Sequence, residues 1–197
     1  MKLRTIAIAA SFFITGQAFA AHDAAAKDAQ DEFFNVLNSF CGQAFAGKVV
    51  VDNSDDPRFK DKVTILHVRD CGRDEIRMPM HVGDDHSRTF ILTKTDAGIK
   101  LSHDHRHEDG QPDKLSLYGG NTAGYGTKWR QEFPVNDFSK QLFMANDLQV
   151  SVTNIWSISI IEGQSISYEL RRPGREFRID FDLNSPVENP PAAWGHQ

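Results

Sequence analysis

"EFRIDFDL", residues 176–183, alternates strictly between polar and apolar side chains. The apolar members share one face of an extended chain: Phe177, Ile179, Phe181 and Leu183. Alternation with a period of two predicts a β-strand that turns one face to a core and the other to water. Strands of this kind are typical of antiparallel sheets with a single covered face. The segment therefore predicts an all-β fold.

The same alternation recurs upstream, in segments that begin near Glu75 and Gly98 and in two that contain Trp156 and Tyr168. Short turn sequences separate such segments, among them "VGDDHS", "TDAG", "IEGQ" and "RPGR". Short turns between successive strands imply hairpins, so we expect an antiparallel meander of about nine strands. The stretch 119–146 is rich in glycine and aromatic residues and is expected to be a long loop with one or two irregular strands.

One segment has the periodicity of a helix. Between Asp28 and Cys41 the apolar residues recur at helical spacing, and Gly42 follows as a natural stop. The residues of this face are Phe33, Phe34, Leu37 and Phe40. We therefore expect one N-terminal helix ahead of the strands.

The strands must bury their common apolar face, either by closing into a barrel or by folding into two packed sheets. A meander with a short N-terminal helix resembles the lipocalin-type (calycin) barrel. The resemblance is one of architecture, because "FAGKVV", residues 45–50, lacks the tryptophan of the Gly-x-Trp signature that opens lipocalins. No lipocalin binding residue is carried over to this chain.

The first twenty residues have the layout of a secretory signal peptide. Lys2 and Arg4 precede an apolar run, and Ala18-Phe19-Ala20 forms a small-x-small cleavage site. The run is shorter than the ~20 residues of a membrane-spanning helix, and no later segment is long and apolar enough to span. We expect an exported protein, periplasmic or extracellular, without an integral membrane segment.

These signals divide the chain into four parts. We assign residues 1–20 to the signal peptide, 21–45 to the N-terminal helix, 46–184 to one β-barrel domain and 185–197 to a proline-rich tail. The prolines exclude regular structure from the tail, so it should be extended.

The two cysteines, Cys41 and Cys71, are expected to form a disulfide because an exported chain meets an oxidising compartment. The alternative is a pair of free buried thiols. The formal net charge is -5, and loss of Lys2 and Arg4 with the leader removes two positive charges to give -7. An acidic chain without a basic run is poorly suited to nucleic acid.

"LSHDHRHEDG", residues 101–110, places His103, His105 and His107 at alternate positions after a predicted strand. They share the parity of the apolar Leu101, so they should continue the interior face toward one rim of the barrel. Counting hairpins places "VGDDHS" at the same rim and Cys71 at the opposite end, where the helix should close the barrel.

This row suggests a metal site for zinc or copper. Alternate residues on a strand are about 6.8 Å apart, so His103 and His107 are separated by roughly 13 to 14 Å and cannot share one ion. A His-x-His pair needs further ligands, and Asp85 and His86 on the same rim are the candidates, whereas His81 should point outward. The alternative is a solvated hairpin tip whose charge pairs contribute little.

Asn154 and Trp156 share the apolar parity of their segment. With His103 and His105 they form the predicted ligand-binding set. A buried Asn needs hydrogen-bond partners, so Asn154 either orients a ligand or satisfies a neighbouring backbone group.

Three functions remain open from the sequence. The first is an exported barrel that binds a small apolar or amphipathic ligand beneath a histidine-rich rim. The second is a zinc- or copper-binding protein, or a metal-dependent enzyme that uses a His-x-His pair. The third is an envelope interaction module without a cavity. No catalytic residue, ligand or oligomeric state follows from the sequence.

Overall fold

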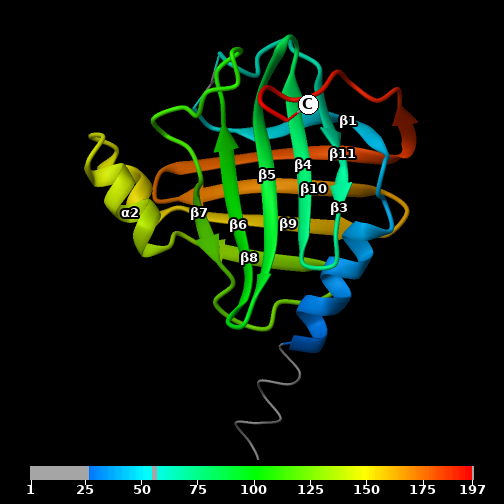
Figure 1. Ribbon diagram of the computed structural model, residues 1–197, viewed down its shortest axis with the longest axis horizontal. Helices are drawn as coiled ribbons and strands as arrows, with labels where there is room; N and C mark the ends of the chain where they lie inside the picture. The colour runs from blue at the N-terminus through cyan, green and yellow to red at the C-terminus, as the bar shows by residue number, and fades with distance from the viewer. Residues whose placement is uncertain (1–26, 55–56, 197) are drawn as a thin grey trace, which may run out of the picture.

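The structure, a computed structural model, describes residues 27–54 and 57–196, and the predicted leader lies outside them. The described residues form a helix over residues 27–38, a second helix and eleven strands (Figure 1). The elements are β1 (Ala44–Asp52), β2 (Thr64–His67), β3 (Asp70–Cys71), β4 (Glu75–Val82), β5 (Asp85–Thr95), β6 (Gly98–His105), β7 (Tyr118–Asn121), β8 (Arg130–Pro134), α2 (Asp137–Met144), the 3-10 helix η1 (Gln149–Thr153), β9 (Ile155–Ile161), β10 (Ser165–Arg172) and β11 (Arg175–Val187).

The strands form one antiparallel sheet with the order β7-β6-β5-β4-β2-β1-β11-β10-β9-β8, and β3 pairs with β4 beside it. The two ends of this order meet where Gly120 bridges to Val135 and the N–H of Asn136 donates to the carbonyl of Gly119 at 3.1 Å. In Figure 1, β4, β5 and β6 run across β8 to β11, which lie behind them. The sheet is a nearly closed barrel, which confirms the predicted barrel architecture.

Two glycines of β7 allow the barrel to close. A Cβ on Gly119 would overlap the carbonyl group of Leu101 on β6, and a Cβ on Gly120 would overlap the carbonyls of Phe133 and Pro134 on β8. Any larger residue at these positions would push β7 away from one neighbour. The aromatic and glycine-rich stretch thus contains the strand that completes the barrel.

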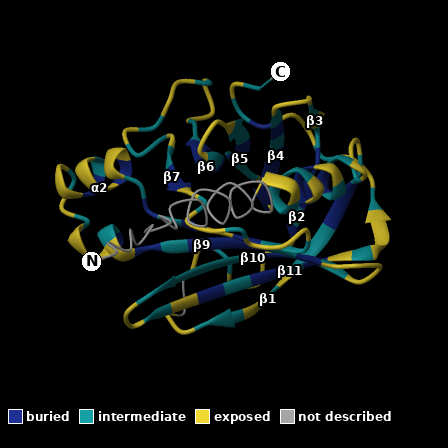
Figure 2. Cartoon of the chain, turned by 90° about the horizontal axis from the view of Figure 1, so that it is seen from below, coloured by how far each residue is buried: buried dark blue, intermediate teal, exposed yellow. Residues whose placement is uncertain are grey.

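The core occupies the inside of the barrel. The strand that carries "EFRIDFDL" buries Phe177, Ile179 and Phe181, as its alternation predicts, and its polar residues face outward. The facing strands contribute a matching set of buried side chains, among them Ile76, Met78, Phe90, Leu92, Ile99, Leu101, Trp156, Ile158 and Ile166. Figure 2 shows buried residues along the strands and exposed ones at the turns and on the helices.

The N-terminal helix packs at the end of the barrel where β5 turns into β6. Phe33, Phe34 and Leu37 are buried in the same core as the strands. The Asp31 carboxylate lies 2.7 Å from Nζ of Lys94 in β5. The helix ends at residue 38, and a disulfide between Cys41 and Cys71 ties its end to β3. The predicted disulfide is therefore confirmed.

Residues 119–146 are more regular than the sequence indicates, because they contain β7, β8 and α2. Asn136 caps α2, and its side-chain oxygen accepts a hydrogen bond from the N–H of Ser139 at 3.0 Å. Only Ser139 and Phe143 of α2 are buried, so its apolar stripe is too narrow to reveal a helix by periodicity. The Asn cap is the signal that could have located it.

The C-terminal tail leaves β11 at Val187 and returns over the barrel. Residues 188–193 have no regular structure, and Ala193 is buried. The N–H of Trp194 donates to the carbonyl of His86 in β5 at 3.0 Å. Among the described helices, none has the length and apolar character that crossing a membrane requires.

Replacing both cysteines by alanine should destabilise the fold. Cys41 and Cys71 are separated by 30 positions, so their bridge should contribute about 3 to 4 kcal/mol by restricting the unfolded chain. Urea unfolding of the wild type and of the Cys41→Ala/Cys71→Ala variant measures this difference. A reductant should lower the wild-type midpoint and leave the variant unchanged. Equal midpoints for both proteins without reductant would contradict the prediction.

Candidate functional site

His103 lies inside the barrel and is almost completely buried. Its Nδ1 lies 3.1 Å from the carbonyl of Tyr118, so this nitrogen carries the hydrogen and donates it. Its Nε2 then accepts a hydrogen bond from the hydroxyl of Tyr168 at 2.8 Å. Burial lowers the pKa of His103 to about 3. The ring is therefore neutral, with both nitrogens satisfied.

Aromatic rings surround His103 on several sides. Tyr118 stacks on it with ring centroids 4.8 Å apart, Trp156 lies at 5.0 Å and Phe90 at 5.2 Å. Tyr168 stacks on Phe90 at 4.5 Å. At this level the barrel is filled by its own side chains, in the region where the sequence suggested a ligand.

His105 lies one step nearer the rim. Its Nε2 is 3.2 Å from the hydroxyl of Tyr118, and burial, together with the nearby Arg88 guanidinium, lowers the pKa of His105 to about 4. Arg88 is directly opposite His105 on β5 and shares its face. Arg88 pairs with Asp85 at 2.6 Å, and its guanidinium lies over the ring of Phe59. Arg88 was missed by the sequence analysis, although it has the same parity as Phe90.

His107 lies beyond the end of β6 on the surface. Its side chain is 60% exposed, and its Nε2 is 3.6 Å from a carboxylate oxygen of Asp113. The three histidines of the row thus have three environments: the interior for His103, the rim for His105 and the solvent for His107. The structure does not bring them together.

The two predicted loops, "VGDDHS" and the end of "LSHDHRHEDG", lie at the same rim, as expected from the topology. The N–H of Arg106, just beyond β6, donates to the carbonyl of Ser87 at 3.0 Å, which joins the two predicted loops. His86, however, contacts a histidine of β4. Its Nδ1 lies 2.6 Å from Nδ1 of His81 in β4.

A β-bulge brings His81 and His86 together. Met80 is opposite Arg88 and Val82 is opposite Asp85, so His81 alone faces the two residues between them, His86 and Ser87. Strand alternation puts His81 on the outer face, as expected, yet it is only 2% exposed. Burial, reinforced by the neighbouring His86 and His67, lowers the pKa of His81 to about 4.

The tail brings a further histidine to the outer face of β6. His196 places Nε2 at 2.8 Å from a carboxylate oxygen of Asp104, which also accepts hydrogen bonds from Arg106 and Ser116. Burial alone would raise the pKa of Asp104, but these three bonds hold it well below its ordinary value. The carbonyl of His196 accepts from Arg69. The pairing of His196 with Asp104 spans 92 positions and has no signature in the sequence.

The two remaining ligand candidates have separate environments. Trp156 belongs to the core and contacts His103. Asn154 is buried at the start of the same segment, and its side-chain oxygen accepts from Arg172 at 3.2 Å. Its backbone carbonyl accepts from Val135 at 2.9 Å. These contacts fit the alternative of a structural Asn.

The metal candidates His103, His105, His107, His86 and Asp85 are distributed over the interior, the rim, the solvent and the outer face. Within residues 27–54 and 57–196, no group of three or more His, Cys, Asp or Glu side chains is arranged to hold a metal ion.

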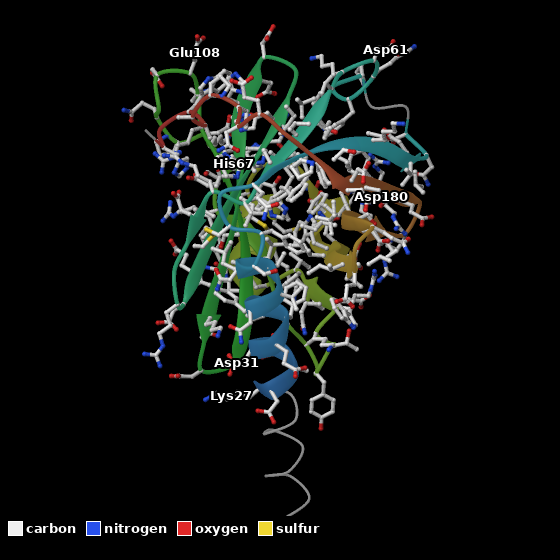
Figure 3. All side chains as sticks on the ribbon, turned by 90° about the vertical axis from the view of Figure 1, so that its right-hand side faces the viewer. Lys27, Asp31, Asp61, His67, Glu108 and Asp180 are labelled. Carbon is white, nitrogen blue, oxygen red and sulfur yellow. A yellow bond between two sulfur atoms is a disulfide. The ribbon has the colours of Figure 1, made fainter. Side chains whose placement is uncertain are left out.

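Two concave regions lie outside the aromatic core. One, of about 1090 Å³, lies between the N-terminal helix, the β5–β6 turn and residues 122–125, and Lys27 and Asp31 mark it in Figure 3. The other, of about 670 Å³, lies along β1 and β11, beside Asp61 and Asp180 in the same figure. We call this second region the β1–β11 groove. Its walls come from segments far apart in the chain, so no local sequence pattern indicates it.

The fold defines a class: a nearly closed antiparallel β-barrel of the up-and-down type, fastened by one disulfide to an N-terminal helix. Comparison with protein families, with curated proteins and with solved structures finds no match to this chain.

The buried His103 should make the fold sensitive to acid. Its folded pKa of about 3 lies below the ordinary value of 6.5, so between these values the unfolded chain binds an extra proton there. The free energy of unfolding should therefore fall as the pH drops below about 6.5, by up to about 2 kcal/mol between pH 7 and 5 for this residue. Urea unfolding at several pH values measures this slope.

The test variant is His103→Gln, and His107→Gln is the matched control. The first should remove the contribution of His103 to the pH dependence of the unfolding free energy and leave the contributions of His81 and His105, whose pKa values burial also lowers. The second changes an exposed side chain and should keep the wild-type slope. A wild-type slope in His103→Gln would show that another group is responsible.

Proposed function

We propose that the protein is an exported binding protein for a small amphipathic molecule, and that the β1–β11 groove holds this ligand. The observation that carries the proposal is the groove itself, with a volume of about 670 Å³. Small-molecule sites commonly measure about 300 to 1,000 Å³ and are mostly apolar with a few polar groups. The signal-peptide-like leader and the disulfide support export.

The apolar part of the groove includes aliphatic side chains that are exposed to solvent. Val50 of β1 is 50% exposed, and Val63, just before β2, is 65% exposed. Phe181 and Val187 of β11 also line the groove. Two large aliphatic side chains left in water at one depression form the surface that an apolar ligand would cover.

Gly47 shapes the floor of the groove. A Cβ at this position would come within 2.6 Å of Cε1 of Phe181 and 2.9 Å of Oγ1 of Thr64. The register between β1 and β11 also shifts on either side of Gly47 and Lys48. The buried ring of Phe181 occupies the space that a side chain at Gly47 would take, so Gly47 lets β1 pack closely on β11. The register shifts make the sheet irregular beside the groove.

Charged groups surround the apolar surface. Lys48 and Lys62 line the groove, as do Asp61, Asp180 and Asp182. Asp180 is paired with Arg178 at 2.6 Å. Charges of both signs around an apolar floor suit a ligand with an apolar body and a polar head. The filled aromatic interior around His103 supports a location outside the barrel.

The test is binding of an uncharged environment-sensitive dye, Nile red, to wild type and two variants. Val63→Glu places a carboxylate in the apolar wall and should weaken dye binding by about tenfold or more, because the charge must be desolvated. Val150→Glu is the matched control, since Val150 is 64% exposed in η1 and lies outside the groove. Fluorescence titration gives the dissociation constants. Equal affinities for all three proteins would refute the proposed site.

Native mass spectrometry of untagged protein provides an independent check. An amphipathic molecule that accompanies wild type and Val150→Glu, but is depleted from Val63→Glu, would support the proposal. Retention of the same molecule by Val63→Glu would place its site elsewhere.

A further inference from the structure

The His81–His86 pair has a geometry that the barrel core does not explain. The two rings come from adjacent strands, with centroids 4.8 Å apart and planes at 66°. Their Nδ1 atoms face each other at 2.6 Å. At this distance a single hydrogen lies between the two nitrogens, so one ring donates and the other accepts.

The remaining nitrogen of His81 has no partner. Its Nε2 is buried without a hydrogen bond, whichever of the two rings donates at Nδ1. No partner therefore requires a hydrogen to be present on Nε2 or absent from it, so the tautomer of His81 is not fixed at this nitrogen. In contrast, both nitrogens of the buried His103 are satisfied.

We infer that His81 and His86 form a two-coordinate site for Cu(I), a monovalent d10 cation that takes the place of the hydrogen between the two Nδ1 atoms. Imidazole nitrogen is a suitable ligand for copper. Cu(I) accepts two ligands in a line, as does Ag(I). The site therefore needs no third protein ligand.

Proton balance is maintained within the pair. Both rings must present a bare Nδ1 to the ion, so each must carry its hydrogen on Nε2. The accepting ring already has this tautomer, and the donating ring moves its hydrogen from Nδ1 to Nε2. No proton is released, and the pair gains the single positive charge of the ion. The lowered pKa of His81 keeps its ring neutral and available as a ligand.

The local backbone can adjust to the ion. Metal–nitrogen bonds of about 2 Å on opposite sides of the ion put the nitrogens about 4 Å apart. The two Nδ1 atoms, now 2.6 Å apart, must therefore move apart by roughly 1.4 Å. His86 lies in the bulge, where the strand has an extra residue and is less constrained by pairing. The tail covers this position through Trp194, whose N–H is bonded to the His86 carbonyl.

Silver tests the site without redox chemistry. Ag(I) is titrated as its nitrate, in chloride-free buffer, into untagged protein with the disulfide intact, and native mass spectrometry counts the ions. We expect one tightly bound ion per chain. Ring nitrogen NMR should show both His81 and His86 in the Nε2–H form with their Nδ1 signals shifted, while the His103 ring keeps its Nδ1–H form.

The variants separate this site from other silver-binding groups. His86→Asn should weaken binding more than about 100-fold, because only one ligand remains. His107→Asn removes an exposed imidazole and Met144→Leu removes an exposed thioether, and both should bind as the wild type does. Cu(I) held reduced by ascorbate should compete with Ag(I) for the same signals.

Two results would overturn the inference. One is silver binding that leaves the His81 and His86 ring signals unchanged, and the other is wild-type affinity in His86→Asn. The NMR result comes from the wild-type protein, so it holds even if a variant at the buried His81 fails to fold.

Discussion

The contact between β7 and β8 joins the two ends of the sheet and closes the barrel. Without the bridge from Gly120 to Val135 the sheet would be open, with two unpaired edges. The same contact anchors α2, since the hydroxyl of Ser139 accepts from the N–H of Gly119 at 2.7 Å. Closure therefore fixes β6, β7, β8 and α2 together, and it decides which side chains face one another across the interior.

Closure also determines where a ligand can lie. It presses Tyr118 of β7 against His103 and brings Trp156 of β9 beside both rings. A small barrel can be filled by its own side chains, and here the aromatic residues fill it. Apolar surface that remains available is found where the sheet is irregular, beside Gly47, and not beneath the histidine rim.

Strand periodicity predicts those features that depend on neighbouring residues. The alternation in "EFRIDFDL" placed Phe177, Ile179 and Phe181 in the core, and the same parity placed His103 inside. Hairpin counting found the shared rim, because short turns leave little freedom. Strand spacing also separated His103 from His107. These predictions depend only on residues that are close together in the sequence.

The unpredicted features arise from irregularities and from contacts between distant segments. The bulge that joins His81 to His86 adds one residue to β5, and the groove needs β1, β11 and residue 63 together. Burial affects His81 and His103 alike, since it keeps both rings neutral. Their hydrogen bonds differ: His103 has two partners, whereas Nε2 of His81 has none. A buried imidazole with both nitrogens satisfied stabilises the fold as it stands, and one with an unpaired nitrogen retains the capacity to change its tautomer and bind.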